Sequence, residues 1–343
     1  MRKLLNTLYI TSEDKYLSLE NNNVVIWDND TRVQQYPLGM LEGIVTFSYK
    51  GASPALMGAC AKQRIQLSFM TPHGKFLARI SSLEHSNVLL RRTQYRIADD
   101  PQRSCRIARN FIFGKTYNMR WVLGRTVRDH AMRIDTVKLN AVIDRLVEKM
   151  PLIAQAESME QLRGLEGNAA RDYFSVFDEM VLNQKVDFTF DGRHKRPPTD
   201  NVNAMLSFVY VILANDCASA LESVGLDAQV GFMHTDRSGR ESLSLDLVEE
   251  LRAPVADRLV ITMINNRMIH DKDFDRHTDG SVMLNDTGRK AVLKAYQTHK
   301  KEIITHPYLE EKIEWGLVPY VQAQLLSRLL RNDIDEYPPF LWK

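Results

Sequence analysis

The 343-residue chain has few cysteines and no long apolar run. Cys60, Cys105 and Cys217 are widely spaced, so they form no metal-binding knuckle, and such scattered cysteines are typical of a reducing cytoplasm. The apolar run FVYVILA near the middle is far shorter than the roughly 20 residues that span a bilayer. The first residues, MRKLLNTLYITSED, contain no apolar stretch of the signal-peptide type. We therefore expect a cytoplasmic protein with no membrane contact.

An excess of charge of one sign is also missing. The chain has 45 lysines and arginines against 43 aspartates and glutamates, a formal net charge of +2, which by itself indicates no particular partner. With 44% hydrophobic and 26% charged residues, the composition is that of a globular protein and excludes a disordered chain. The length favours two domains.

Acidic residues are nearly absent from one segment, between Arg91 and Arg128, where only Asp99 and Asp100 occur. Its ten basic residues are Arg91, Arg92, Arg96, Arg103, Arg106, Arg109, Lys115, Arg120, Arg125 and Arg128. Arginine suits phosphate because its guanidinium group binds two oxygens at once. The segment therefore indicates either a nucleic-acid contact or an ordinary solvated helix face, and its residues alone do not decide between them.

The predicted secondary structure changes near residue 88. Short alternating runs before it, such as TLYITS, YLSLE and VVIWD, predict strands separated by turns. SPALMGACAKQ predicts a short helix with Ser53 as its N-cap and Pro54 in first position. DNVNAMLSFVYVILANDCASALESVG, apolar almost all round, predicts a central buried helix. The fold class is therefore α+β, with a small β-rich domain over 1–88 and a larger α-helical domain over 89–343.

Glu166 lies in the segment LRGLEGNAARDYF, which we expect to form the start of a helix. Taken alone, this carboxylate is best interpreted as a capping acid that interacts with the exposed N–H groups of the first turn. That interpretation does not explain Gly167, whose lack of a side chain would let a bulky substrate approach the carboxylate.

His234 opens a second segment, GFMHTDRSGRESLSLDLVEEL, which combines imidazole, guanidinium and carboxylate groups. Its leucines recur at helical spacing, and Asp246 and Glu249 lie off that apolar stripe and near each other. An imidazole nitrogen and carboxylate oxygens suit Mn²⁺ or Mg²⁺, and Arg237 and Arg240 would neutralise a phosphate at the same metal. The alternative is a salt-bridged surface helix.

A third segment, DGRHKRPPTDNVNAML, is a basic loop that leads into the predicted central helix. Arg193, Lys195 and Arg196 are candidates for contacts with a nucleic-acid backbone, and we interpret His194 as an exposed loop residue. A plain charged connector explains the same residues equally well.

Four segments in order resemble one known family: LEGNAARDYF, RPPTDNVNAMLSFVY, GFMHTDRSGRESLSLDLVEELR and the terminal YPPFLWK. They are similar to the CRISPR-associated integrase, the catalytic protein of the spacer-acquisition complex, in the version found in type I-C systems. The resemblance implies a β-rich domain that pairs two protomers and a helical domain that binds one divalent metal, Mg²⁺ or Mn²⁺. Carried over, the metal ligands and catalytic residues are Glu166, His234 and Glu249, where many relatives carry aspartate at the third position. Asp246 is the alternative third ligand.

The resemblance also implies a reaction and partners. The 3′-hydroxyl of a DNA fragment attacks a phosphodiester of the CRISPR repeat, so the protein needs no nucleophilic side chain. Candidate nucleic-acid-binding residues are Arg91, Arg92, Arg106, Arg109, Arg196, Arg237 and Arg240. The expected partners are double-stranded DNA with single-stranded ends, CRISPR repeat DNA, a second copy of the chain and a small ferredoxin-like adaptation protein.

Two other functions remain open at this point. A catalytically silent DNA-binding scaffold would keep the same fold, but three site residues of the metal-binding type favour an enzyme. A metallohydrolase of small phosphoesters would not need the extended basic segment.

Overall fold

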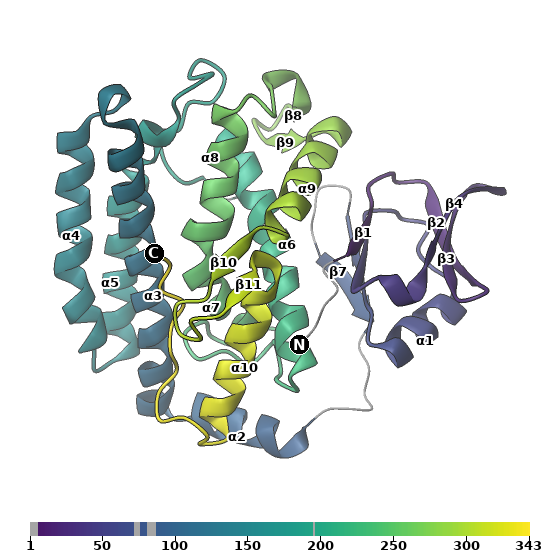
Figure 1. Ribbon diagram of the computed structural model, residues 1–343, viewed down its shortest axis with the longest axis horizontal. Helices are drawn as coiled ribbons and strands as arrows, with labels where there is room; N and C mark the ends of the chain where they lie inside the picture. The colour runs from purple at the N-terminus through teal and green to yellow at the C-terminus, as the bar shows by residue number, and fades with distance from the viewer. Residues whose placement is uncertain (1–5, 72–75, 81–86, 195) are drawn as a thin grey trace.

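The structure, a computed structural model, describes residues 6–71, 76–80, 87–194 and 196–343. A β-rich N-terminal part lies beside a larger helical part, and the N-terminal part contributes almost all of the sheet (Figure 1). The predicted α+β class is therefore confirmed.

The N-terminal part contains two sheets. One is a four-stranded sheet in the order β1-β5-β6-β7, with β1, β5 and β6 parallel and β7 antiparallel to β6. The other is the antiparallel meander β2-β3-β4. The strands are β1 (Thr7–Ile10), β2 (Lys15–Glu20), β3 (Asn23–Asp28), β4 (Thr31–Pro37), β5 (Gly43–Thr46), β6 (Gln66–Met70) and β7 (Phe76–Ile80).

Helix α1 (Pro54–Gln63) connects β5 to β6 and has the predicted cap. The Ser53 hydroxyl accepts a hydrogen bond from the Leu56 N–H, and Pro54 stands where no backbone donor is needed. Leu56 packs with Leu17 and Ile44 in a core of this part's own, and all three are fully buried. The predicted strands and the short helix in this part are therefore confirmed where the structure describes them.

The remaining chain is mostly helical, as predicted. Its α-helices are α2 (Val88–Ala98), α3 (Pro101–His130), α4 (Thr136–Ala154), α5 (Met159–Phe174), α6 (Asn201–Ser223), α7 (Ser242–Leu251), α8 (Arg258–Asn265), α9 (Asp286–Lys300) and α10 (Val318–Leu330). A π-helical turn, η4 (Arg252–Asp257), joins α7 to α8. Two small hairpins that the sequence did not indicate are β8 (Phe274–Arg276) with β9 (Val282–Leu284), and β10 (Ile303–Thr305) with β11 (Lys312–Glu314). Short 3-10 turns occur at η1 (Leu38–Met40), η2 (Ala131–Arg133), η3 (Phe177–Met180), η5 (Asp271–Asp273) and η6 (Trp315–Leu317).

Helix α6 is the central buried helix that the sequence predicts. Asp200 caps its start through the Asn203 N–H, and the chain turns away at Gly225, whose φ is +87°. By length and composition α6 could cross a membrane, but 67% of its apolar window is buried inside the protein. Burial of this kind is what a core helix shows.

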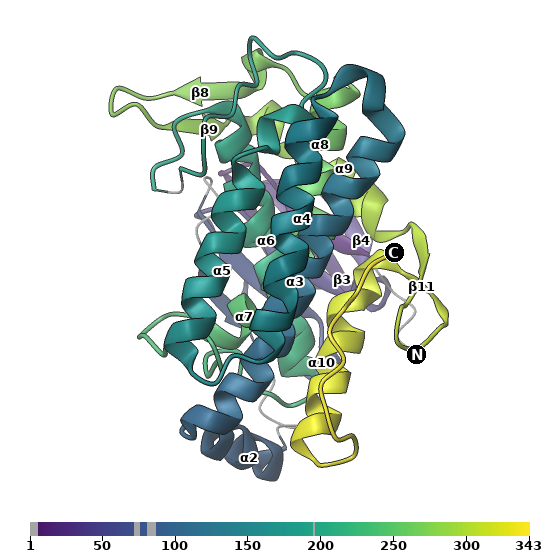
Figure 2. The same ribbon diagram turned by 90° about the vertical axis from the view of Figure 1, so that its left-hand side faces the viewer.

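Helices α3, α4 and α5 pack against one another along much of their length, and α7 lies against α3 and α6 (Figure 2). The C-terminal segment runs beside α10 and returns to α3, where Tyr337, Phe340 and Trp342 are buried. This packing brings residues of α3, α5 and α7 to one place.

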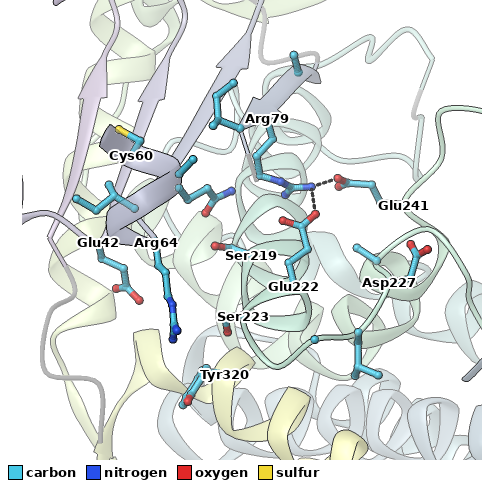
Figure 3. Close-up of a pocket in the computed structure, with 18 of the residues that line it drawn as sticks. Glu42, Cys60, Arg64, Arg79, Ser219, Glu222, Ser223, Asp227, Glu241 and Tyr320 are labelled. Atoms are coloured by element: carbon cyan, nitrogen blue, oxygen red, sulfur yellow. Dashed lines mark hydrogen bonds and ion pairs between the residues drawn. The ribbon is translucent and has the colours of Figure 1, made fainter. Parts of the chain in front are cut away.

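The N-terminal part contacts the helical part through α6 and the start of α7. The Ser68 hydroxyl donates to Asn215 Oδ1 over 3.0 Å, and Arg79 is ion-paired with Glu222 at 3.2 Å and with Glu241. A cavity of about 960 Å³ lies between the two parts, and Arg79 stands in its wall (Figure 3).

Candidate active site

Glu166, His234 and Glu249, which lie far apart in the sequence, meet in one cluster. His234 Nε2 is 3.9 Å from Glu249 Oε1. The Lys115 ammonium on α3 is 2.7 Å from Glu249 Oε2 and also contacts Glu166 Oε1. The cluster therefore joins α3, α5, α7 and the loop before α7.

Helix α5 carries Glu166 in its middle, not at its mouth. Its N-cap is Ser158, whose hydroxyl accepts from the Gln161 N–H. The interpretation of Glu166 as a capping acid is therefore wrong, because the helix begins two turns earlier. A Cβ built on Gly167 meets nothing within 4 Å, so the space beside Glu166 is open, as its glycine neighbour suggested.

Asp246 fixes the histidine. Its Oδ2 accepts from the Phe232 N–H at 2.6 Å and the Met233 N–H at 3.0 Å. Its Oδ1 accepts from the His234 backbone N–H at 3.0 Å and lies 2.6 Å from His234 Nδ1. Because a carboxylate only accepts, Nδ1 carries a proton, and Nε2 is the ring nitrogen that faces Glu249.

The same contacts bear on the choice between Asp246 and Glu249. Asp246 is fully buried, and both of its oxygens are used by the loop and by His234. Gly231 makes this approach possible, since a Cβ there would lie 2.9 Å from Asp246 Oδ2. Asp246 therefore orients the imidazole, while Glu249 is the α7 carboxylate that shares a cation with Glu166.

Two cations, the buried Lys115 and the partly buried Arg252, hold Glu249 ionised. Burial raises the pKa of this carboxyl, but Arg252, 2.9 Å from Oε1, and Lys115 outweigh it and hold the pKa at about 2. Burial lowers the pKa of Lys115, yet Glu249 and Glu166 more than offset it, so the ammonium is charged at neutral pH. The site therefore contains paired charges that are shielded from water.

Helix α7 is buried on nearly all sides. Of its ten residues all but Leu245 are buried, so the alternative of a salt-bridged surface helix is wrong. Behind the cluster, Glu250 accepts from the Phe340 N–H at 2.7 Å and from Gln322 Nε2 at 3.1 Å, and it contacts the Tyr337 hydroxyl. Burial raises the pKa of Glu250 to about 7. The C-terminal segment therefore braces the helix that carries Asp246 and Glu249.

Arg252 links Glu249 to a buried aromatic group. Its guanidinium lies 4.8 Å from the centre of the Tyr210 ring, and that of Arg193 lies 5.4 Å from the same ring. The Tyr210 hydroxyl donates to Asp257 Oδ1 over 2.6 Å. Sequence reasoning placed Arg252 only among the charges of the alternative surface helix, and it did not identify Tyr210 as part of the site.

The predicted DNA-binding arginines fall into different environments. Arg92, Arg106, Arg196 and Arg237 are exposed, whereas Arg91, Arg109 and Arg240 are partly buried. Arg91 lines the cavity between the two parts, and Arg109 donates to the Ala154 carbonyl over 3.1 Å. The structure thus leaves the exposed four available to a backbone phosphate.

Two basic residues differ from their predicted surroundings. Lys115 is buried among acids and does not belong to a surface stripe. The Arg193 guanidinium donates hydrogen bonds to Asn203 Oδ1 and Ser207 Oγ, so its position does not support the suggested contact with a nucleic-acid backbone. Lys195 lies outside the described residues, and His194 is exposed, as predicted.

The donor set suits a divalent cation. Two carboxylates and the Nε2 lone pair are the ligands that Mn²⁺ and Mg²⁺ accept, and Asp246 supplies the outer hydrogen bond typical of a ligating histidine. The two carboxylates already share one cation, the Lys115 ammonium. Among the described residues, no group of three or more His, Cys, Asp or Glu side chains is arranged so that it could hold a metal ion.

Solved structures define the class of fold. A casposase bound to integration product superimposes with a TM-score of 0.84 at 22% identity, covering 99% of this chain and 95% of that one. A CAS1 protein from Thermotoga maritima gives 0.80 at 23% identity, with 95% and 97% coverage. A chain of a Cas6-RT-Cas1–Cas2 complex gives 0.80 at 21% identity, with 98% of this chain and 36% of that chain covered. The chain thus has the fold that casposase and CAS1 proteins share.

Sequence comparison then gives the family. The family model described as CRISPR associated protein Cas1 matches residues 8–298, and the chain belongs to this family. It is 45% identical over 343 residues to a CRISPR-associated endonuclease Cas1 of Chlorobaculum tepidum, and 46% identical over 347 residues to one of Rhodospirillum rubrum. In both cases the whole of each chain is covered. The resemblance to the CRISPR-associated integrase is confirmed at the level of the family.

Proposed function

We propose that this protein is a divalent-metal-dependent DNA endonuclease and integrase that inserts DNA fragments into a CRISPR array. The observation that supports it most directly is that Glu166 and Glu249 share the Lys115 ammonium, while His234 Nε2 lies 3.9 Å from Glu249 Oε1. The finer features, namely Mn²⁺ or Mg²⁺ as the metal and the type I-C version, belong to the same proposal.

Glu166, His234 Nε2 and Glu249 would hold the metal. When bound, a divalent ion would supply polarisation of a phosphodiester and stabilisation of the extra negative charge of the in-line transition state. Asp246 holds the His234 ring through Nδ1, so that Nε2 is directed toward Glu249. Arg252 holds Glu249 in one orientation through its 2.9 Å ion pair. The nucleophile is the 3′-hydroxyl of the fragment, which the protein positions without reacting itself.

The DNA would lie across the seven predicted arginines, four of which are exposed and three partly buried. Arg237 and Arg240 follow His234 directly, at a turn closed by the Arg240 N–H and the Arg237 carbonyl, and they would fix phosphates near the attacked bond. Arg91, Arg92, Arg106, Arg109 and Arg196 would bind the backbone farther away. Such contacts position double-stranded DNA with single-stranded ends, and the CRISPR repeat, without reading their sequence.

The proposal includes assembly and location. We infer that residues 1–88 form a dimerisation domain and residues 89–343 the catalytic domain, and that two copies pair through the former. The small ferredoxin-like adaptation protein is the further partner, in keeping with the Cas6-RT-Cas1–Cas2 complex, one chain of which has this fold over 36% of its length. The proposed location is the cytoplasm.

The test is a strand-transfer assay with a fragment that has 3′ single-stranded ends and a target that contains the repeat. Mn²⁺ or Mg²⁺ should be required. Glu166→Ala, His234→Ala and Glu249→Ala should each abolish cleavage and strand transfer while binding to DNA persists, because the arginines supply most of the affinity. Wild-type protein that binds DNA but transfers no strand with either metal would indicate the silent scaffold instead.

A further inference from the structure

Lys115 is a buried lysine in the middle of α3. Its side chain is 5% exposed, and its ammonium lies 2.7 Å from Glu249 Oε2 and contacts Glu166 Oε1. Lysine is rarely buried unless it is paired. Here the two partners are the same two carboxylates that the proposed function assigns to a divalent cation.

The charges of the cluster already balance. Glu166 and Glu249 contribute two negative charges, and Lys115 and Arg252 contribute two positive charges. Asp246 is compensated separately by three backbone N–H groups and the His234 ring. A divalent cation held by the same carboxylates would add two charges next to a buried ammonium, where water and salt do not screen the repulsion.

Of the two cations, Lys115 is the one that can leave. The Arg252 guanidinium is held over the Tyr210 ring at 4.8 Å, and its planar group is fixed by that stacking. Lysine instead has a flexible stem of four carbons and no planar group to stack. Glu166 is 23% exposed, so the ammonium has a way to solvent past this carboxylate.

We propose that Lys115 is an internal counter-cation of the Glu166–Glu249 pair, and that a divalent cation binds this pair by displacing its ammonium. Lys115 then keeps the two carboxylates close together before the metal arrives, and it weakens the affinity for the metal. The inference rests on the proposed function, because it takes these carboxylates as metal ligands.

The first experiment measures Mn²⁺ binding by isothermal titration calorimetry to the wild type, Lys115→Met and a matched control, Lys149→Met. Lys149 pairs with Asp172 of the same helix α5 at 2.6 Å, so its loss also removes a lysine–carboxylate pair. We expect Lys115→Met to bind Mn²⁺ at least tenfold more tightly than the wild type, and Lys149→Met to stay within twofold. Without metal, Lys115→Met should melt at a lower temperature, and Mn²⁺ should raise its melting temperature more than that of the wild type.

A second measurement uses the unaltered protein and does not depend on the folding of a variant. Lysines are acetylated with an N-hydroxysuccinimide ester, with and without saturating Mn²⁺, and each site is quantified by peptide mass spectrometry. Lys115 should react several-fold faster when Mn²⁺ is bound, whereas Lys149 should not change. Mn²⁺ bound through Glu166 and Glu249 with Lys115 still protected would overturn the inference.

The outcomes separate the inference from the proposed function. If Glu166→Gln and Glu249→Gln both weaken Mn²⁺ binding but Lys115→Met binds no more tightly than the wild type, only the displacement is wrong. If neither the wild type nor Lys115→Met binds Mn²⁺, or if both glutamate variants bind it normally, the metal site fails and the inference fails with it.

Discussion

At the scale of single residues, Asp246 decides which nitrogen of the His234 ring faces Glu249. The Asp246 carboxylate offers only acceptors to the His234 ring and to three backbone N–H groups. In Asp246→Asn, the amide N–H₂ either faces a backbone donor or donates to Nδ1, which moves the ring proton to Nε2. We expect Mn²⁺ affinity and strand transfer to fall by about 10- to 100-fold, as is usual for loss of an outer hydrogen bond to a ligating histidine.

The control for this prediction is Asp236→Asn, an exposed aspartate of the same loop that should behave like the wild type. Wild-type metal affinity in Asp246→Asn would contradict the orienting role. A different result, loss of activity in Asp246→Ala but not in Glu249→Ala, would make Asp246 the third ligand.

A second residue, Asp257, should make stability depend on pH. Burial raises its pKa to about 6, against the lowering by the Tyr210 and Tyr173 hydroxyls. The folded state therefore keeps Asp257 protonated up to about pH 6, whereas the unfolded state releases this proton near pH 4. The contribution of the proton to the free energy of unfolding is fully present below pH 4 and is lost as the pH rises through 6. Each pKa unit corresponds to about 1.4 kcal/mol.

Asp257→Asn removes this titration. The variant should be less stable than the wild type at pH 4.5, since the amide offers one acceptor fewer to the two tyrosines. The difference in free energy of unfolding between the wild type and the variant should shrink by about 2–3 kcal/mol at pH 7.5, because at that pH only the wild type has an ionised group at residue 257. Chemical denaturation at both pH values measures the difference, and a deficit that does not change with pH would show that Asp257 does not titrate in this range.

At the scale of elements, α7 is held by a segment 90 residues farther along the chain. The Tyr337 hydroxyl and the Phe340 N–H both reach the buried Glu250. Tyr337→Phe keeps the ring but leaves one carboxylate oxygen with a missing donor, so the free energy of unfolding should fall by about 1–3 kcal/mol. Tyr308→Phe, at a tyrosine that is 49% exposed, is the control and should change it by less than about 0.5 kcal/mol. Equal stability of the two variants would mean that the tail hydroxyl does not brace α7.

Helices α2 and α3 carry two of the arginines that we expect to bind DNA. Arg92 and Arg106 are exposed on them, so each is available to a phosphate. In Arg92→Glu/Arg106→Glu, affinity should fall for all DNA sequences alike, and the slope of log affinity against log salt should become shallower by about two. Arg276→Glu, which reverses charge on the β8 hairpin, should leave both unchanged. A double variant with the wild-type slope would show that this segment is an ordinary solvated helix face.

Local signals explain which elements the sequence could predict. The Ser53–Pro54 start of α1, the Asp200 start of α6 and the predicted N-terminal strands depend on neighbouring residues, and they appear where expected in the described part of the chain. Glu166, His234 and Glu249 could be selected because their segments resemble a family. The buried position of Lys115 could not be predicted, because α3 is 30 residues long and has both a buried and an exposed face. A count of basic residues along the helix does not tell which of them lie on the buried face.

The contacts that hold the site residues in place could not be predicted from the sequence either. Asp246 was seen as an acid near Glu249, but its contact with His234 requires the close approach at Gly231. The contact between Glu250 and Phe340, like the stacking of Arg252 on Tyr210, joins residues that are distant in the chain. Such contacts depend on how helices pack, and periodicity in one segment does not reveal them.

At the scale of the whole molecule, Arg79 joins the β-rich part to the helix that carries the site. Its side chain is 5% exposed, and it pairs with Glu222 at the end of α6 and with Glu241 at the start of α7 (Figure 3). Burial raises the pKa of both glutamates, and Arg79 counteracts that rise. Without the guanidinium, two partly buried carboxylates would face each other unpaired.

Arg79→Met should therefore lower the free energy of unfolding by about 1–3 kcal/mol at pH 8, a range reduced for the partial exposure of the two glutamates. At pH 5 the loss should be smaller, because the glutamates, whose pKa values rise further in the variant, take up protons in the folded state and lose their repulsion. Arg79→Met/Glu222→Gln/Glu241→Gln should recover most of the stability at pH 8, since no unpaired charge is left. Urea denaturation of the three proteins at both pH values measures these differences. A loss in Arg79→Met that is as large at pH 5 as at pH 8, with no recovery in the triple variant, would mean that Arg79 contributes packing and that its charge does not hold the two parts together.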